Sequence, residues 1–199
     1  MKPDTLLAAF AVALYTLTLA GADGITKFIA KGYAAPQLFF LSALIILGLT
    51  MVTARVQQAG GVLRTGFPRA MFARAVLTVI ASIAFFMAFR HLPFADVFLF
   101  MGLIPIIAAL LSGPVLREPI KPAAWVALLA GLAGVWCLLP TGLSSLSAGH
   151  GWALLASVSG ATSLLMARFI GRGEKNLMPQ VFYPYLAIAV TMGLALPFV

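Results

Sequence analysis

Seven long apolar runs fill most of the chain, and short polar stretches separate them. They lie at about 5–30, 35–53, 75–89, 94–113, 122–139, 151–170 and 180–198, and the third reaches membrane-spanning length once 71–73 are added. A helix of roughly 20 apolar residues crosses a bilayer, where only helices and closed barrels satisfy their backbone hydrogen bonds. Barrel strands would alternate polar and apolar residues, which these runs do not do. The pattern therefore predicts an all-α integral membrane protein with seven transmembrane helices.

Composition supports a membrane protein and argues against most other classes. Hydrophobic residues make up 62% of the 199 positions and charged residues 9%, whereas a soluble domain has about 25% charged residues. The net charge of +8 would suggest nucleic acid on a soluble chain, but here the basic residues lie between the apolar runs. Cys137 is the single cysteine, and the sequence has no HExxH, Walker or GxSxG motif. We therefore expect no metal, no cofactor, no nucleic-acid partner and no enzymatic activity.

The distribution of basic residues predicts the orientation in the membrane. With the N-terminus in the cytoplasm, ten of the 13 basic residues lie at or inside the inner surface, and only Lys27, Lys31 and Arg90 lie outside. The ten are Lys2, Arg55, Arg64, Arg69, Arg74, Arg117, Lys121, Arg168, Arg172 and Lys175. The positive-inside rule thus predicts a multi-pass protein of the cell (inner) membrane with a cytoplasmic N-terminus.

Two short blocks of sequence recur later in the chain. Residues 27–32 read KFIAKG and 168–173 read RFIGRG, while 36–40 read PQLFF and 179–183 read PQVFY. In each copy the first block ends an apolar run and the second begins the next, so one period contains five crossings. An odd number of crossings inverts the second copy, which is the inverted-repeat architecture of secondary transporters. We therefore assign 1–140 to a first module and 151–199 to the start of a second, with 5–30 inside the fold rather than in a signal peptide.

The repeat also predicts a longer protein. A second copy as long as the first would require about 285 residues and would give ten helices in a 5+5 arrangement. The chain ends at Val199, after two helices of the second module. We therefore expect a piece of a ten-helix protein, with a natural short form that pairs with another chain as the alternative.

An ordered set of short motifs occupies the stretch 74–140. The motifs are Arg74 at a helix start, Leu92-Pro93-Phe94-Ala95 in a turn, Pro105 in mid-helix, Leu116-Arg117-Glu118 at a corner, Gly131 and Gly134 in a helix, and Pro140 at its end. This set resembles the middle of an EamA-type module of the drug/metabolite transporter superfamily, which usually has Gly where Arg117 stands. The resemblance covers essentially the whole chain, but the family's complete form has three more helices.

The resemblance implies a multi-pass transporter of small organic metabolites that works by alternating access, with a metabolite and the lipid bilayer as partners. The loop 62–68, together with Asp23 and Lys27, is similar to the S-adenosylmethionine or riboflavin carrier branch, and amino-acid exporters are the close alternative. Many relatives carry Arg in the second helix, where this chain has only Ser42 as a polar group. This difference weakens the inference that the relatives' binding site for a charged substrate is also present here. A non-transporting membrane subunit or truncated remnant that needs a partner chain is the alternative of another class.

Ionisable residues within predicted spans are the first candidates for a substrate site, because their burial in a bilayer is costly. Asp23 and Lys27 lie four residues apart near the end of the first helix, in the order that favours an ion pair. They could bind substrate or a proton, or they could form a neutralised pair with Lys27 extending to the interface. Gln37, at the start of the second helix, could bind substrate or cap the helix. Its repeat partner Gln180 has the same two interpretations.

The fourth predicted helix supplies the remaining candidates. Phe94 and Phe98 share a face that Pro105 extends, and an aromatic wall would suit a flat heterocyclic solute, although packing explains it equally well. Pro105 predicts a kink, and the resemblance favours a cavity role for it, because the third and fourth helices line the pathway in this superfamily. Asp96 lies in the first turn of this helix, where capping is its simpler use.

Overall fold

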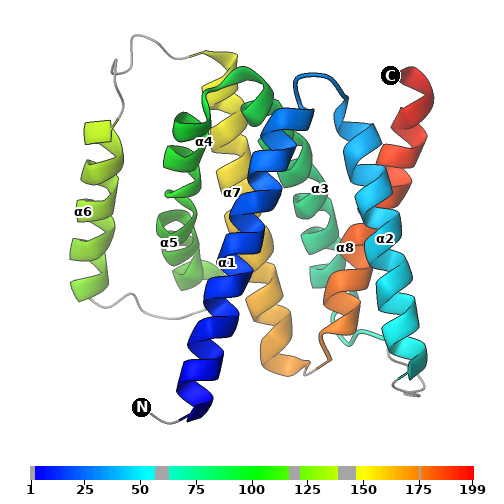
Figure 1. Cartoon of the computed structure of the whole chain (residues 1–199). Coiled ribbons are helices and arrows are strands. Elements are labelled where there is room, and N and C mark those ends of the chain that lie inside the picture. The colour runs from blue at the N-terminus through cyan, green and yellow to red at the C-terminus, as the bar shows by residue number, and fades with distance from the viewer. Residues whose placement is uncertain (1–2, 57–62, 117–121, 139–146, 175) are drawn as a thin grey trace.

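The computed structural model describes residues 3–56, 63–116, 122–138, 147–174 and 176–199, and these residues form helices joined by short turns, with no strand among them (Figure 1). The elements are α1 (Pro3–Ile29), α2 (Ala35–Val56), α3 (Pro68–His91), α4 (Phe94–Met101), α5 (Ile104–Leu116), α6 (Pro122–Leu138), α7 (Ala148–Gly173), α8 (Met178–Ala195) and the 3₁₀ turn η2 (Leu196–Phe198). The predicted corner at 117–121 and most of the predicted loop 140–150 lie outside the described residues.

Six segments among the described residues are long and apolar enough to cross a membrane. They are Ala9–Ile29, Ala35–Val56, Pro68–His91, Phe94–Val115, Ala148–Gly173 and Met178–Phe198. These segments confirm six of the seven predicted spans and define a multi-pass integral membrane protein. The remaining one, α6, is an apolar helix of 17 residues and is therefore about 26 Å long, shorter than a bilayer core of about 30 Å.

The fourth span is two helices rather than the single kinked helix predicted from the sequence. The Leu103 N–H donates to the Phe100 carbonyl at 3.0 Å, so the chain tightens into a 3₁₀ turn between α4 and α5. Pro105 lies in the first turn of α5 and has no N–H to donate to the Met101 carbonyl, which accounts for the break at this point. The Ser157 hydroxyl of α7 donates to the Phe100 carbonyl at 2.7 Å and ties the break to the rest of the bundle.

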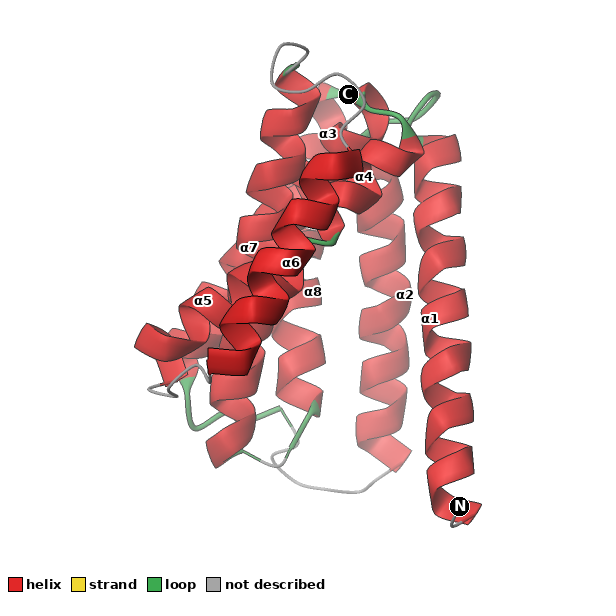
Figure 2. Ribbon diagram, turned by 90° about the vertical axis from the view of Figure 1, so that its left-hand side faces the viewer, coloured by secondary structure: helices red, strands yellow, loops and turns green. Residues whose placement is uncertain are grey.

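Helix α3 lies at the centre of the bundle and packs mainly against α7 and α8, while α2 packs against α8. Figure 2 shows α1 and α2 on one side of this centre and α5 and α6 on the other. Small residues dominate the buried face of α7 and are frequent on that of α3, which permits the close helix approach used in membranes. On α6, a Cβ added to Gly131 would meet Ile106 of α5 at 3.6 Å, whereas one added to Gly134 would meet nothing within 4 Å.

The two repeated blocks lie at equivalent places in the fold. The KFIAKG block starts in the last turn of α1 and RFIGRG ends α7, whereas the two PQ blocks lie in the first turns of α2 and α8. Helix α1 runs from bottom to top in Figure 1 and α7 runs from top to bottom. The helix pairs α1–α2 and α7–α8 thus run in opposite directions, as an inverted repeat requires.

The approach of α7 to the end of α3 predicts a strong effect at Gly149. A Cβ on Gly149 would lie 2.7 Å from Leu92 Cγ and 3.0 Å from His91 Cβ, whereas a Cβ on Gly151 would meet nothing within 4 Å. Overpacking of this kind costs about 1–3 kcal/mol, which exceeds the helix-propensity gain of about 0.5–1 kcal/mol. We expect Gly149→Ala to lower the thermal unfolding midpoint of the purified protein and Gly151→Ala to keep or raise it. Equal midpoints would contradict this packing.

Candidate functional site

A cavity of about 450 Å³ lies inside the helical bundle. Its lining comes from α1, α2, α3, α7 and α8, with two residues beside the break between α4 and α5. The lining residues are Leu19, Asp23, Thr26, Phe39, Arg74, Thr78, Ala81, Ser82, Phe85, Phe86, Phe89, Met101, Ile104, Gly160, Ser163, Leu164, Gln180, Val181, Pro184 and Tyr185. The cavity therefore combines side chains from both predicted modules.

Arg74 and Gln180 form the polar centre of this cavity. Arg74 lies in the second turn of α3, and its Nη1 donates a hydrogen bond to Oε1 of Gln180 in the first turn of α8. Gln180 is only 6% exposed, and its amide nitrogen would lie 3.8 Å from a Cβ on Gly171 of α7. The buried Nε of Arg74 has no hydrogen-bond partner among the described residues. The guanidinium is thus held between three helices with part of its donor capacity unused.

Hydroxyl groups extend the polar surface along α3 and α7. Thr78 and Ser163 share a hydrogen bond of 2.8 Å between their oxygens, and both also lie within 3.4 Å of the Arg74 carbonyl. Ser82 lies one turn beyond Thr78, and its hydroxyl donates to the Thr78 carbonyl. Arg74, Thr78 and Ser82 therefore follow an i, i+4, i+8 pattern on one face of α3, and this periodicity in the sequence is a signal from which the polar surface could have been predicted.

Phenylalanines form the apolar part of the cavity wall. Phe85, Phe86 and Phe89 come from α3, and Phe39 of α2 meets Phe86 edge to face with ring centroids 6.0 Å apart. Phe86 is fully buried, so it contributes to helix packing as well as to the wall. Phe94 and Phe98, the aromatic candidates of the fourth predicted helix, are not among these lining residues.

Besides Gln180, Asp23 is the candidate from the sequence that lines the cavity. It shares one face of α1 with Leu19 and Thr26, in the spacing i−4, i, i+3. Lys27 lies one turn further on, but its ammonium donates to the carbonyls of Phe89 and Leu92 at the end of α3. Among the described residues, neither Asp23 nor Lys27 forms an ion pair, so the predicted Asp23–Lys27 pair does not form. Lys27 instead satisfies helix-end carbonyls that have no helical donor.

The other predicted site residues lie outside the cavity lining. The Gln37 Oε1 accepts from the Ala34 N–H at 3.1 Å and so caps the exposed start of α2. Phe94 and Phe98 are both 37% exposed and contact each other with ring centroids 4.6 Å apart. Pro105 shapes the α4–α5 break next to the lining residue Ile104. Asp96 lies in the first turn of α4 but makes no capping hydrogen bond through its side chain.

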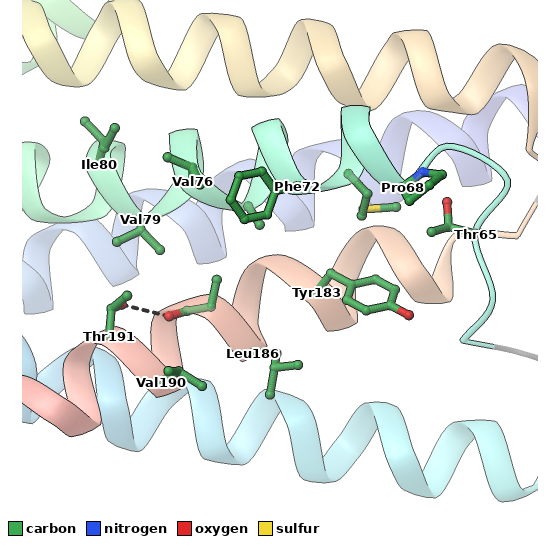
Figure 3. A pocket seen from close by; sticks show the side chains of 13 residues that line it. Thr65, Pro68, Phe72, Val76, Val79, Ile80, Tyr183, Leu186, Val190 and Thr191 are labelled. Carbon is green, nitrogen blue, oxygen red and sulfur yellow. Dashed lines mark hydrogen bonds between the residues drawn. The ribbon is translucent and has the colours of Figure 1, made fainter.

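A larger groove of about 630 Å³ lies between α3 and α8 and is almost entirely apolar (Figure 3). Its lining includes Phe72, Val76 and Val190, which are 71%, 40% and 52% exposed. Such a lining offers a polar solute few hydrogen-bonding groups. The smaller cavity, which has the buried polar groups, is therefore the better candidate site despite its size.

Comparison with known proteins shows a distant similarity to a membrane exporter. No protein-family model matches the chain. The chain is 29% identical over 165 residues to the pseudopaline exporter CntI of Pseudomonas aeruginosa, in strains UCBPP-PA14 and PAO1. The match covers 82% of this chain and 56% of each relative, so the chain spans little more than half the length of the curated relatives. A multi-pass helical membrane protein with a few polar side chains in an otherwise apolar cavity is thus similar to a membrane exporter.

The contacts of Lys27 predict a structural role that can be separated from its charge. Replacing Lys27 by Met removes two charge-assisted hydrogen bonds to α3, and we expect a loss of about 1–2 kcal/mol in unfolding free energy. Lys31 is exposed just beyond α1, so Lys31→Met is the matched control. Thermal unfolding of the purified variants in detergent measures the difference. Identical unfolding midpoints for the two variants would show that the Lys27 contacts add nothing to stability.

Proposed function

We propose that this chain forms the substrate-binding part of a membrane exporter of small organic metabolites. The observation that carries the proposal is the cluster of partly buried Arg74 and Thr78 with buried Gln180 and Ser163, within a cavity between apolar helices. Polar and ionisable groups are costly in a bilayer and commonly mark substrate pathways. Distant similarity to an exporter supports outward transport of the solute.

The proposed family is the EamA-type drug/metabolite transporter superfamily, with a ten-helix inverted repeat in the complete protein. Opposite directions of α1 and α7 and the repeated blocks at their ends support the repeat. Secondary transporters with such repeats bind substrate near the midplane, where the repeats meet. The lining of the cavity supports this arrangement, because it comes from α1, α2 and α3 of the first proposed module and α7 and α8 of the second.

Alternating access requires an element that can change its shape. The break at Gly102 and Leu103 lies beside the cavity residues Met101 and Ile104, and two helix ends meet there. Breaks in transmembrane helices concentrate backbone dihedral freedom at a few residues, as hinges do. We therefore assign the α4–α5 break as the hinge that opens the cavity to either side.

Transport in vesicles tests the proposed function directly. The protein, expressed from its complete gene, is placed in inverted membrane vesicles, and uptake of a panel of labelled metabolites is compared with that of vesicles lacking it. Exporters in inverted vesicles accumulate their solute, so we expect protein-dependent accumulation of at least one member. A stable protein that moves no member in either direction would favour a non-transporting membrane subunit.

The positions of Asp23 and Asp96 predict unequal effects on this transport. Asp23 lines the cavity, whereas Asp96 lies in the first turn of α4 outside the lining, where Asn is also well tolerated. We expect Asp23→Asn to lower the transport rate about tenfold or more with normal membrane insertion, as loss of a charged hydrogen bond would. Asp96→Asn should keep a rate close to wild type. Equal, near-wild-type rates for both variants would remove Asp23 from the site.

A further inference from the structure

We propose that Arg74, held in position by Gln180, binds a carboxylate group of the transported solute. The proposal rests on the proposed transport function, because that function makes the bound ligand a transported solute. It assigns the solute a chemical class, namely an organic acid with one carboxylate at this end of the cavity and an apolar or aromatic body along the apolar lining. Charge, hydrogen-bond geometry and the composition of the lining each support it.

The charge of Arg74 has no neutralising partner among the described residues. Glu174 accepts a hydrogen bond from Thr65, and Asp96 lies in α4 outside the cavity lining. Asp23 lines the same cavity but lies one turn before Lys27, which contacts the far end of α3. A helical rise of 1.5 Å per residue puts Asp23 on the order of 15 Å from Arg74 along the bundle. A cation between apolar helices with only a neutral amide partner is costly unless an anion joins it.

The donors of Arg74 match a carboxylate. A guanidinium has five N–H donors in a planar fork, and a carboxylate accepts two of them side by side. Gln180 accepts a hydrogen bond from Nη1 of Arg74, whereas the buried Nε of Arg74 has no partner among the described residues. The Nε edge of the guanidinium can therefore bind a carboxylate once a small side-chain shift exposes it. The Gln180 amide is fixed by its burial against α7 and sets the direction of this edge.

The lining favours a single carboxylate over a more highly charged anion. Arg74 is the one cation among the lining residues, so it balances one negative charge. A phosphate monoester carries close to two charges near neutral pH and would remain partly uncompensated. Phe85, Phe86 and Phe89 lie about 16 Å or more further along α3 than Arg74. The nearer apolar surface for the solute body comes from α8, where Val181, Pro184 and Tyr185 follow Gln180 in the lining. One carboxylate attached to an apolar or aromatic group meets both conditions.

Binding of a matched pair of probes tests the proposal. The protein from its complete gene is purified into nanodiscs of neutral lipid, and binding of labelled indole-3-acetate and its neutral amide, indole-3-acetamide, is measured at neutral pH. We expect the wild type to bind the acid more tightly than the amide. Arg74→Gln should weaken acid binding about tenfold or more and leave amide binding unchanged. Arg69→Gln removes an exposed charge from the same helix and should change neither.

A second variant keeps the test informative if Arg74→Gln fails to fold. Gln180→Glu preserves side-chain shape and places a carboxylate on the Arg74 guanidinium, where it competes with the carboxylate of the solute. We expect at least tenfold weaker acid binding with unchanged amide binding and a monodisperse elution profile. Wild-type protein that shows no preference for the acid, or that binds neither probe at millimolar concentration, would overturn the proposal. Acid binding that survives both substitutions would do the same.

The outcomes separate this proposal from the transport function itself. Binding of the acid through Arg74 without protein-dependent transport in vesicles would overturn the proposed function and leave the carboxylate site standing. Transport of acids and their amides at equal rates, unchanged by Arg74→Gln, would overturn the carboxylate site and leave the transport function standing.

Discussion

The close packing of α3 against α7 is the contact on which the rest of the bundle depends. Lipid tails are as apolar as leucine, so membrane helices associate through close packing of small residues and through hydrogen bonds. Both occur here: Ala88 and Ala153 belong to one buried cluster, and Thr78 shares a hydrogen bond with Ser163. The same seam continues to the α4–α5 break, where Ser157 meets the Phe100 carbonyl. Helix α8 then completes the cavity because it packs against both α2 and α3.

The bilayer explains which parts of the fold could be predicted from the sequence. Span lengths are imposed by membrane thickness and by internal backbone hydrogen bonding, so composition alone located the helices, although α6 is short for a span. The α4–α5 break was predicted as a kink because Pro105 lacks an N–H. Its position two residues earlier depends on Gly102, Leu103 and the contact from Ser157, which only tertiary structure brings together.

The candidate site was harder to predict, for a physical reason visible at Arg74. Arg74 follows a basic loop, so the sequence indicated a residue at the membrane interface. Position in the sequence gives the depth of a residue in the membrane, but it does not tell which helix packs beside that residue. Burial of Arg74 results from α8, more than 100 residues away, which brings Gln180 against it. Lys27 illustrates the opposite case, because its nearest acid in sequence is Asp23 but its partners are carbonyls of α3. Local spacing determines which partners are available within a helix, while packing determines which are used.

The two charges that line the cavity do not compensate each other. At a separation on the order of 15 Å and an effective dielectric constant of about 20, Asp23 and Arg74 attract by only about 1 kcal/mol. Removing either charge from water costs several kcal/mol even after relaxation. Their mutual attraction is therefore too weak to explain why both lie between apolar helices. Each needs a separate partner, and a solute that enters the cavity can supply an anionic group to Arg74 independently of what binds at Asp23.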